Sequence, residues 1–497
     1  MNSTQESPYS PPSSDQSPGV GRIAAVIYRL ARWAGIDRAV AFAVLARFWQ
    51  LFTGPVTQML IILRFTPSTQ DYYYAFNTML GMQVFVELGL HVVLINLTSR
   101  EWAHLSLDDG RITGDAHSLA RLVTLGRMML RWYLTVAVIF AIALTIVGTM
   151  YFTNIDQRRL AEIATAENVR WLAPWFCLVL LNALQLSLLP MTAILEGCHQ
   201  LGPINRIRLW QGVIGTLVVW ALVGGEMGLW ALVGSAAVRT MGELYLVRVP
   251  YRAFFSVFRG PMLTPVELDW KKEVLPLQWR MAAQGAVAWA ASQMPLLVIL
   301  HYHPSSGEAG RFGMTWTILT AFQSASMALV ETRRPLFGSL IAKDAHSELD
   351  ASFERYTKLS MLFMLAAVIC FSLFVWFVGT RIEWLPLRIS EHLLPIIPTM
   401  LLSLAFIAYQ FVMCLGIYVR AHRVDPFLIA SVVSCLVLAC TEFWLGRKYG
   451  ALGVSAAYIT GITLILAPFY FVIYTRFRRE KAATRSAGTG AIPAGRI

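Results

Sequence analysis

Residues 359–380 read LSMLFMLAAVICFSLFVWFVGT, a run that contains no charged side chain. A helix needs about 20 apolar residues to cross the hydrocarbon core of a bilayer, so this run is long enough for one membrane-spanning helix. Comparable charge-free runs occupy residues 132–155, 171–195 and 449–475. A membrane β-barrel would instead show shorter segments of alternating apolar and polar residues. The sequence therefore predicts an all-α, polytopic membrane protein.

The composition of the whole chain agrees with this prediction. Of the 497 residues, 56% are hydrophobic and 14% are charged, whereas a soluble domain has roughly 45–50% and about 25%. We expect about twelve transmembrane helices, at residues 41–63, 72–97, 133–152, 171–194, 205–223, 227–247, 276–300, 309–331, 358–379, 392–416, 424–446 and 450–475.

The positive charge of the chain is explained by its topology. Most of the 41 Lys and Arg residues fall in alternate loops, and the positive-inside rule then places both termini in the cytoplasm. We expect a multi-pass protein of a bacterial inner membrane, in contact with the lipid bilayer. The net charge of +12 follows from this topology and gives no indication of a nucleic-acid partner.

The loop lengths divide the chain into five parts. We expect a cytoplasmic tail with a basic amphipathic helix at 1–40, a six-helix lobe at 41–247 and a cytoplasmic linker at 248–275. A second six-helix lobe at 276–475 and a basic cytoplasmic tail at 476–497 complete the chain.

One short segment recurs between the two predicted lobes. The sequence ALVGSAAV at 231–238 returns as ALGVSAAY at 451–458. This suggests two parallel repeats of six helices. Such duplication is common in secondary transporters, whose substrate sites lie between the repeats.

No motif in the sequence indicates catalysis or metal binding. The six cysteines form no CxxC pair, so the ligand spacing of structural metal sites is missing. No phosphate loop, GxSxG or HExxH motif occurs, and the acidic pair Asp108-Asp109 falls in a predicted cytoplasmic loop. We therefore expect no enzyme, cofactor, catalytic residue or metal site.

Several diffuse patterns of glycine and small residues resemble a known family. They include RFTPSTQDYYYAFN (64–77), VELGLHVVLINLTSRE (86–101), ILEGCHQLGPINRIRL (194–209), GEMGLWALVGSAAV (225–238), LPLQWRMAAQ (275–284) and ETRRPLFGSLIAKD (331–344). The chain resembles polysaccharide flippases of the multidrug/oligosaccharidyl-lipid/polysaccharide exporter superfamily over residues 40–475. Twelve predicted spans, against fourteen in the related lipid II flippase, favour an oligosaccharide exporter, as does the lack of an acidic residue in 41–63.

The resemblance implies both an architecture and a function. Two six-helix lobes would face each other across a central cavity and work by alternating access. The cargo would be an undecaprenyl-diphosphate-linked oligosaccharide, moved from the inner to the outer leaflet for surface polysaccharide assembly. Proteins of polysaccharide assembly would then be partners.

Three arginines within or at the edge of spans are candidate ligands of the diphosphate. Arg47, Arg239 and Arg280 each carry the forked, delocalised positive charge that a diphosphate needs. Ionisable groups inside a membrane are costly and usually face a cavity or a partner. The competing interpretations are snorkelling of Arg47 and Arg280 to the headgroups, and a self-neutralising pair between Arg239 and Glu243 one turn on.

A second set of ionisable residues could couple transport to an ion gradient. Glu87 and His91 lie one helical turn apart in the second predicted span, and both types of side chain can bind and release a proton. Together with Glu243 they are our candidates for coupling to H⁺ or Na⁺. The alternative is a packing role, in which Glu87 and His91 pair with Arg47.

Proline and glycine mark two candidate kinks. Gly54-Pro55 interrupts the first predicted span and Pro295 interrupts the seventh. Proline removes a helical hydrogen bond and bends a helix, so these positions could serve a bending motion. The alternative is tolerated intramembrane proline.

Two other functional classes stay open from the sequence. One is a multidrug or small-molecule cation-coupled antiporter of the same superfamily. The other is a non-transporting membrane protein of polysaccharide assembly.

Overall fold

The structure is a computed structural model. It describes residues 38–83, 87, 90–108, 110–162, 169–260, 275–343, 345–381, 389–422 and 426–488. The predicted amphipathic helix within 1–40 lies almost entirely outside the described residues.

Long helices dominate the described residues. The first part of the chain forms α2 (Arg38–Arg64), α3 (Pro67–Leu80), α5 (Leu90–Trp102), α6 (Ala116–Glu162), α7 (Leu172–Gly197), α8 (Leu201–Gly224), α9 (Trp230–Arg248), α10 (Arg252–Ser256) and the 3-10 turn η1 (Val257–Arg259). The second part forms α12 (Leu275–Tyr302), α13 (Glu308–Glu331), α14 (Arg334–Ala342), α15 (His346–Arg381), α16 (Ile389–His392), α17 (Ile396–Ala421), α18 (Leu428–Gly461), a π-helical turn η2 (Ile462–Leu466) and α19 (Ala467–Gly488).

One small β-hairpin departs from the all-helical pattern. Strands β1 (Leu105–Asp108) and β2 (Arg111–Gly114) pair antiparallel between α5 and α6. The next helix, α6, then begins after Asp115, whose carboxylate accepts the backbone N–H of Ser118 at 2.8 Å. This hydrogen bond stabilises the charged carboxylate and lowers the pKa of Asp115.

The outer faces of the helices are apolar. Leu180, Leu362 and Leu464 are examples of large apolar side chains that lie mostly exposed. Among the described residues, seven helical segments are long and apolar enough to cross a membrane. Because a water-soluble protein would bury such surface, the prediction of an α-helical, multi-pass membrane protein is confirmed.

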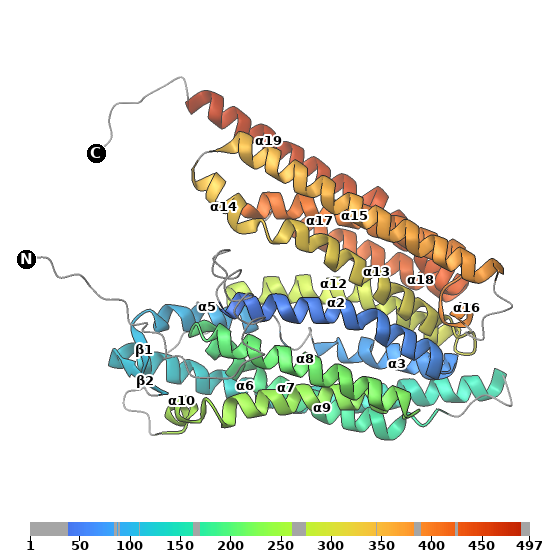
Figure 1. The fold of residues 1–497 in the computed structure, drawn as a ribbon, viewed down its shortest axis with the longest axis horizontal. Helices are drawn as coiled ribbons and strands as arrows, with labels where there is room; N and C mark the ends of the chain where they lie inside the picture. Colours follow the sequence, from blue (N-terminus) through green and yellow to red (C-terminus); the bar gives the residue numbers. More distant parts are fainter. Residues whose placement is uncertain are drawn as a thin grey trace, which may run out of the picture.

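The helices lie in two groups, which Figure 1 shows one above the other. We call α2 to α10 the N-terminal group and α12 to α19 the C-terminal group. Within the first group α2 packs on α8, α6 on α7 and α7 on α9; within the second α12 packs on α18 and α15 on α17. The two groups meet where α3 packs against α13 and α12.

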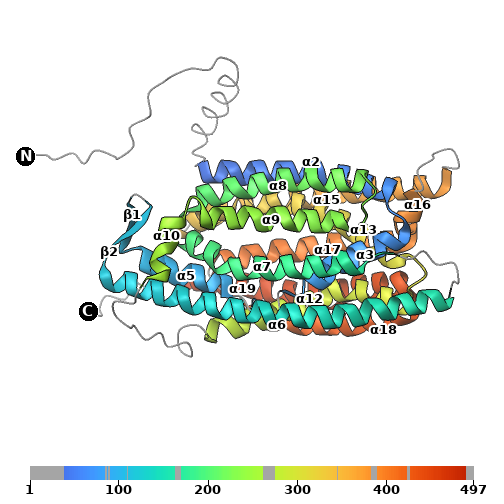
Figure 2. The same ribbon diagram turned by 90° about the horizontal axis from the view of Figure 1, so that it is seen from below.

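The helices run roughly along one common direction, so the bundle has two ends. We call the end where α2 finishes and α3, α13 and α17 begin the distal end. The opposite, proximal end carries β1, β2 and the last turns of α19 (Figure 1). Figure 2 shows α6, a helix of 47 residues, running the length of the bundle between these ends.

One predicted span differs from the helices found, whereas the predicted break between the last two spans is present. The second predicted span, 72–97, is divided, because α3 ends at Leu80 and a turn at Gly81 and Met82 follows. The predicted break between the last two spans, between 446 and 450, is present: at Gly450, with φ 57° and ψ −139°, the chain turns back, so the stretch labelled α18 consists of two helices joined there. A left-handed φ suits glycine, which lacks a Cβ.

The segment predicted as a linker, 248–275, begins as part of the N-terminal group. Phe254 and Phe258 are buried, and the Arg127 side chain of α6 donates from Nε to the Phe258 carbonyl at 2.8 Å. These contacts hold the first residues of the segment against α6. Residues 261–274 lie outside the described part.

Candidate functional site

The clearest polar site of the described residues lies at the distal end, where α3 meets the C-terminal group. Thr66 caps the start of α3 by accepting the N–H of Thr69 at 3.2 Å, and Pro67 occupies the first helical turn. Both features are typical helix starts. They fix the position of Gln70 and Asp71, each of which is only 1% exposed.

Asp71 binds both groups of helices at once. Its Oδ2 forms an ion pair with Arg159 of α6, which is also buried. Its Oδ1 accepts the backbone N–H of Gly310, in the first turn of α13, at 2.5 Å. The first N–H groups of a helix have no partner inside the helix and favour a negative charge. Asp71 therefore caps a helix of the opposite group.

Gln70 makes a second set of contacts across the same boundary. Its Nε2 donates to the carbonyl of Gly310 at 2.8 Å and to the carbonyl of His392 at 3.1 Å. Its Oε1 is hydrogen-bonded to the His392 ring nitrogen Nδ1. All three bonds run from α3 to the C-terminal group.

The close approach of α3 and α13 depends on two glycines one turn apart. A Cβ at Gly310 would lie 2.9 Å from the backbone nitrogen of Asp71, and a Cβ at Gly313 would lie 2.5 Å from the Tyr74 ring. Both distances are shorter than real Cβ contacts. Glycine at both positions therefore lets α13 approach α3 closely.

The end of α6 makes three contacts with the last turns of α12 and the residues just after it. Tyr151 donates from its hydroxyl to the carbonyl of Leu297 at 2.6 Å. Arg158 donates to the carbonyl of His301 at 2.9 Å, and Arg159 donates from Nε to the carbonyl of Pro304 at 2.6 Å. Since the last carbonyls of a helix lack intrahelical donors and favour positive charge, Arg158 satisfies the end of α12, and Arg159 binds the turn that follows it. We call these contacts, with those of Gln70 and Asp71, the distal junction.

A second polar cluster lies inside the N-terminal group, nearer the proximal end. Glu196 of α7 pairs with Arg208 of α8 at 2.5 Å and lies 3.7 Å from Nε2 of His91 in α5. The side chain of Glu87 accepts a hydrogen bond from Gln83 and lies in the electrostatic field of His91. The predicted Glu87–His91 pair is therefore part of a larger cluster that includes Glu196.

Arg239 and Glu243 extend this cluster along α9. The two side chains interact electrostatically, and Arg239 also lies in reach of Tyr73 in α3. Glu243 interacts with Arg208 as well as with Arg239. Gln211 of α8 donates to the Arg239 carbonyl at 2.9 Å, while the Arg239 side chain itself is exposed.

The other predicted site residues lie in α2 and α12. Arg47 and Arg280 occupy helical positions, but their side chains lie outside the described residues. Gly54 with Pro55, and Pro295, lie inside helices that continue through them. Their function in bending stays a prediction.

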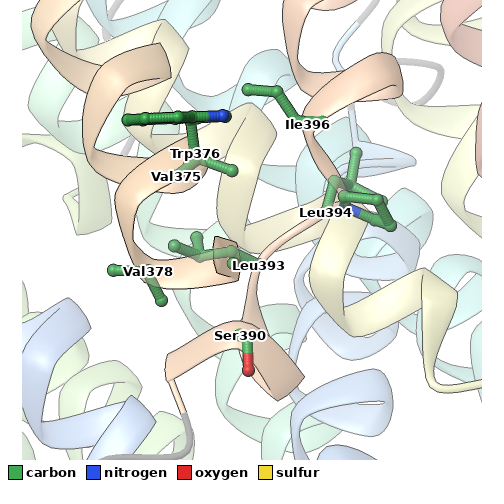
Figure 3. A pocket seen from close by; sticks show the side chains of 9 residues that line it. Val375, Trp376, Val378, Ser390, Leu393, Leu394 and Ile396 are labelled. Atoms are coloured by element: carbon green, nitrogen blue, oxygen red, sulfur yellow. The ribbon is translucent and has the colours of Figure 1, made fainter. Parts of the chain in front are cut away.

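An apolar pocket of about 310 Å³ lies beside the distal junction, between the end of α15, α16 and the start of α17. Figure 3 shows Val375, Trp376 and Leu393 lining it, with the hydroxyl of Ser390 at one side. None of its nine lining residues is charged. A diphosphate needs charge-assisted hydrogen bonds, so this pocket does not provide them.

The sequence-based reasoning missed the distal junction. It assigned Gln70 and Asp71 to the first predicted outer loop and Arg159 to the second predicted outer loop. Two signals were present: TPSTQD is a typical helix start, and Asp71 directly precedes an aromatic run. Neither signal identifies Gly310 or His392 as a partner, because these residues lie hundreds of positions away.

Comparison with known proteins shows the fold. No protein-family model and no curated protein matches this chain. Among solved structures, an inward-facing conformation of a multidrug resistance MATE family transporter of the MOP superfamily is 12% identical. The match covers 89% of this chain and 99% of that one, with a TM-score of 0.63.

Two further structures agree with this result. Lipid II flippase MurJ, in an inward closed conformation, is 12% identical, with 88% of this chain and 87% of that one covered and a TM-score of 0.57. An outward-facing conformation of a multidrug resistance MATE family transporter is 12% identical, with 89% and 96% covered and a TM-score of 0.50. This chain therefore has the fold of the MOP superfamily transporters.

Proposed function

We propose that this protein is an alternating-access transporter that moves an undecaprenyl-diphosphate-linked oligosaccharide from the inner to the outer leaflet. The proposal places twelve spans in two six-helix lobes around a central cavity, in a bacterial inner membrane with both termini cytoplasmic. The observation that carries it is the distal junction, together with the fold.

The distal junction is what a closed gate requires. Among the described residues, hydrogen bonds between the two groups cluster at the distal end, through Gln70, Asp71, Tyr151, Arg158 and Arg159. The positive-inside rule assigns this end to the outside. A protein closed at the outer end and less strongly joined at the inner end would accept cargo from the inner leaflet. The higher TM-score with the inward-facing transporter supports this state.

The charges of the N-terminal group support an anionic cargo. Arg239 is exposed and lies near Tyr73 of α3, the helix at the boundary between the groups. Arg208 is about half exposed beside it in the same cluster. Guanidinium groups bind phosphate oxygens in a forked, bidentate manner. We assign the diphosphate to Arg239, with Arg47 and Arg280 as further ligands.

Coupling to H⁺ or Na⁺ would use the acidic members of the same cluster. Glu87 and Glu243 lie within the electrostatic reach of His91. Binding of a cation to these carboxylates would change the charge next to the arginines. Cargo affinity would then depend on the bound ion, which is the linkage that a coupled transporter needs.

Deletion of the gene tests the proposal. The mutant strain should lose a surface polysaccharide and accumulate its lipid-linked precursor on the inner leaflet, and the wild-type gene should restore both. An Arg239→Ala gene should fail to restore them, and an Arg239→Lys gene should restore them in part. Normal surface polysaccharide in the deletion strain would refute the proposal.

The second candidate is a cation-coupled multidrug antiporter. The TM-score of 0.63 with a multidrug resistance MATE family transporter favours it. The same deletion strain separates the two functions, because the antiporter predicts altered drug tolerance with normal surface polysaccharide.

A further inference from the structure

Glu442 is a buried carboxylate that the proposed function does not use. It lies in α18 and is 1% exposed. Neither of its carboxylate oxygens has a hydrogen-bond partner among the described residues. The neighbouring Phe443 and Trp444 are exposed on the other side of the helix, so Glu442 points away from the lipid and into the protein.

The neighbours of nearby glycines show which helices face Glu442. Leu438, Glu442 and Gly446 form one stripe of α18 at a spacing of one turn. A Cβ on Gly446 would lie 3.4 Å from Val298 of α12, so this stripe faces α12.

The returning segment of the chain covers the same stripe. Gly446 lies close to Val454, and Leu438 lies close to Gly461. In this antiparallel register, Glu442 lies level with Tyr458, which is buried against Trp316 and Phe406. Glu442 and Tyr458 also interact electrostatically. Glu442 is therefore enclosed by α12 and by the helix that follows Gly450.

Among the side chains that the structure describes, the helices packed against α18 place no cation next to this carboxylate. On α12, His301 and Tyr302 are the titratable side chains of the described stretch, and both lie at its distal end. Val298 of α12 lies level with Gly446, so Glu442, one turn earlier in α18, lies level with about residue 294 of α12. Arg280 is therefore about 21 Å away along the axis, toward the start of α12, at about 1.5 Å per residue.

The remaining titratable groups in the described parts of these helices are tyrosines, cysteines and charged side chains that lie near the ends of the bundle. On α17 they are Tyr409, Cys414, Tyr418 and Arg420; on α13 they are Glu308, Arg311 and Glu331; on α18 and η2 they are Cys435, Cys440, Arg447, Lys448, Tyr449 and Tyr458. Arg420 lies near the proximal end of α17, over the Phe427 ring, and Arg447 lies over the Tyr302 ring. Cys435 lies on the same helix within electrostatic reach of Glu442, and a thiol cannot supply a positive charge.

An ionised carboxylate in this position would be very unfavourable. Transfer of an unpaired charge from water to a low-dielectric interior costs far more than proton uptake by the carboxylate. The enclosed position therefore favours the neutral, protonated carboxyl.

We propose that Glu442 is a proton-binding site of the C-terminal group, enclosed between α12 and the helix that follows Gly450. A proton needs one ligand oxygen, whereas Na⁺ needs several, and Glu442 has no oxygen partner among the described side chains. Proton binding at Glu442 does not depend on the proposed cargo. If the protein is a coupled transporter, this site adds a candidate for coupling to Glu87, His91 and Glu243.

Asp71 provides a matched control within the same chain. Both carboxylates are 1% exposed. Asp71, however, pairs with Arg159 and accepts the N–H of Gly310, and both partners stabilise its charged form.

Labelling with dicyclohexylcarbodiimide, followed by peptide mass spectrometry, tests the proposal on the full-length protein in nanodiscs. The protonated carboxyl adds across the carbodiimide, and the adduct rearranges to a stable N-acylurea, so the labelled peptide gains the mass of the reagent. At about pH 7, exposed carboxylates are ionised and do not react. We expect labelling at Glu442, no labelling at Asp71, and loss of the labelled peptide in Glu442→Gln.

Sodium and an isosteric variant complete the experiment. Added Na⁺ should leave the labelling of Glu442 unchanged, and Glu442→Gln should unfold at the same temperature as the wild type, because the amide imitates the neutral carboxyl. An unlabelled Glu442, protection by Na⁺, or equal labelling of Asp71 would each overturn the proposal. None of these outcomes concerns oligosaccharide, so the proposed cargo is judged separately.

Discussion

Replacement of Gln70 by methionine should shift the distal end from closed to open. Methionine has a similar length and no strong hydrogen-bonding group. The change removes the bonds from Gln70 to the Gly310 carbonyl, the His392 carbonyl and the His392 ring. All three cross between the groups, so they can exist only while the distal end is closed.

The size of the shift follows from these three bonds. A neutral hydrogen bond contributes about 0.5–1.5 kcal/mol net, so their loss should cost the closed state roughly 1.5–4.5 kcal/mol. The ratio of closed to open protein should then fall by roughly tenfold to a thousandfold. Pulsed electron paramagnetic resonance can measure this ratio, with one spin label on the α2–α3 turn and one on the α12–α13 turn.

Gln410→Met is the control for this experiment. Gln410 is fully buried, and its Nε2 donates to Ser326 at 3.0 Å and to Ser360 at 2.7 Å, all inside the C-terminal group. This variant should lower the unfolding temperature and leave the distance between the labels unchanged. The reasoning is wrong if Gln70→Met keeps the wild-type distance, or if Gln410→Met lengthens it equally.

Three further predictions use other contacts. A disulfide between Pro67→Cys and Gly307→Cys should lock the distal end, because the two Cβ positions are 3.4 Å apart, close to the roughly 3.5–4.5 Å of disulfides. Oligosaccharide flipping should stop on oxidation and resume on reduction, and continued flipping by the oxidised protein would exclude a moving gate here. Purified Arg239→Ala should bind a diphosphate lipid at least about tenfold more weakly, for the loss of one charge-assisted bond of about 1.5–3 kcal/mol; unchanged affinity would remove Arg239 from the cargo site. Gly450→Ala should lower the unfolding temperature, because a left-handed φ costs a Cβ about 1–2 kcal/mol and this Cβ would meet the Glu308 carboxylate; an unchanged temperature would contradict this.

The helical class of this protein could be predicted because it depends on local composition. The charge-free runs 359–380 and 132–155 lie entirely inside the helices α15 and α6. The run 171–195 lies inside α7 except for its first residue. A run of about 20 apolar residues can satisfy its backbone in a membrane only as a helix. No partner segment is needed for that conclusion.

The predicted site residues were recognised for the same local reason. Arg239, Glu243, Glu87 and His91 stand out as charges inside apolar stretches. Their grouping around Glu196 could not be predicted, because it depends on how α5, α7, α8 and α9 pack.

Only the tertiary structure decided which end of the bundle is joined and which carboxylates are paired. Asp71 and Glu442 are equally buried acids, and sequence alone gives no reason to separate them. Asp71 meets Arg159 of α6 and, over 200 residues away, the start of α13. Glu442 lies on the stripe of α18 that faces α12, and its carboxylate has no hydrogen-bond partner among the described residues. The energy of a buried charge depends on its neighbours in space, and those neighbours are set by the packing of distant helices rather than by the residues next to it in the chain.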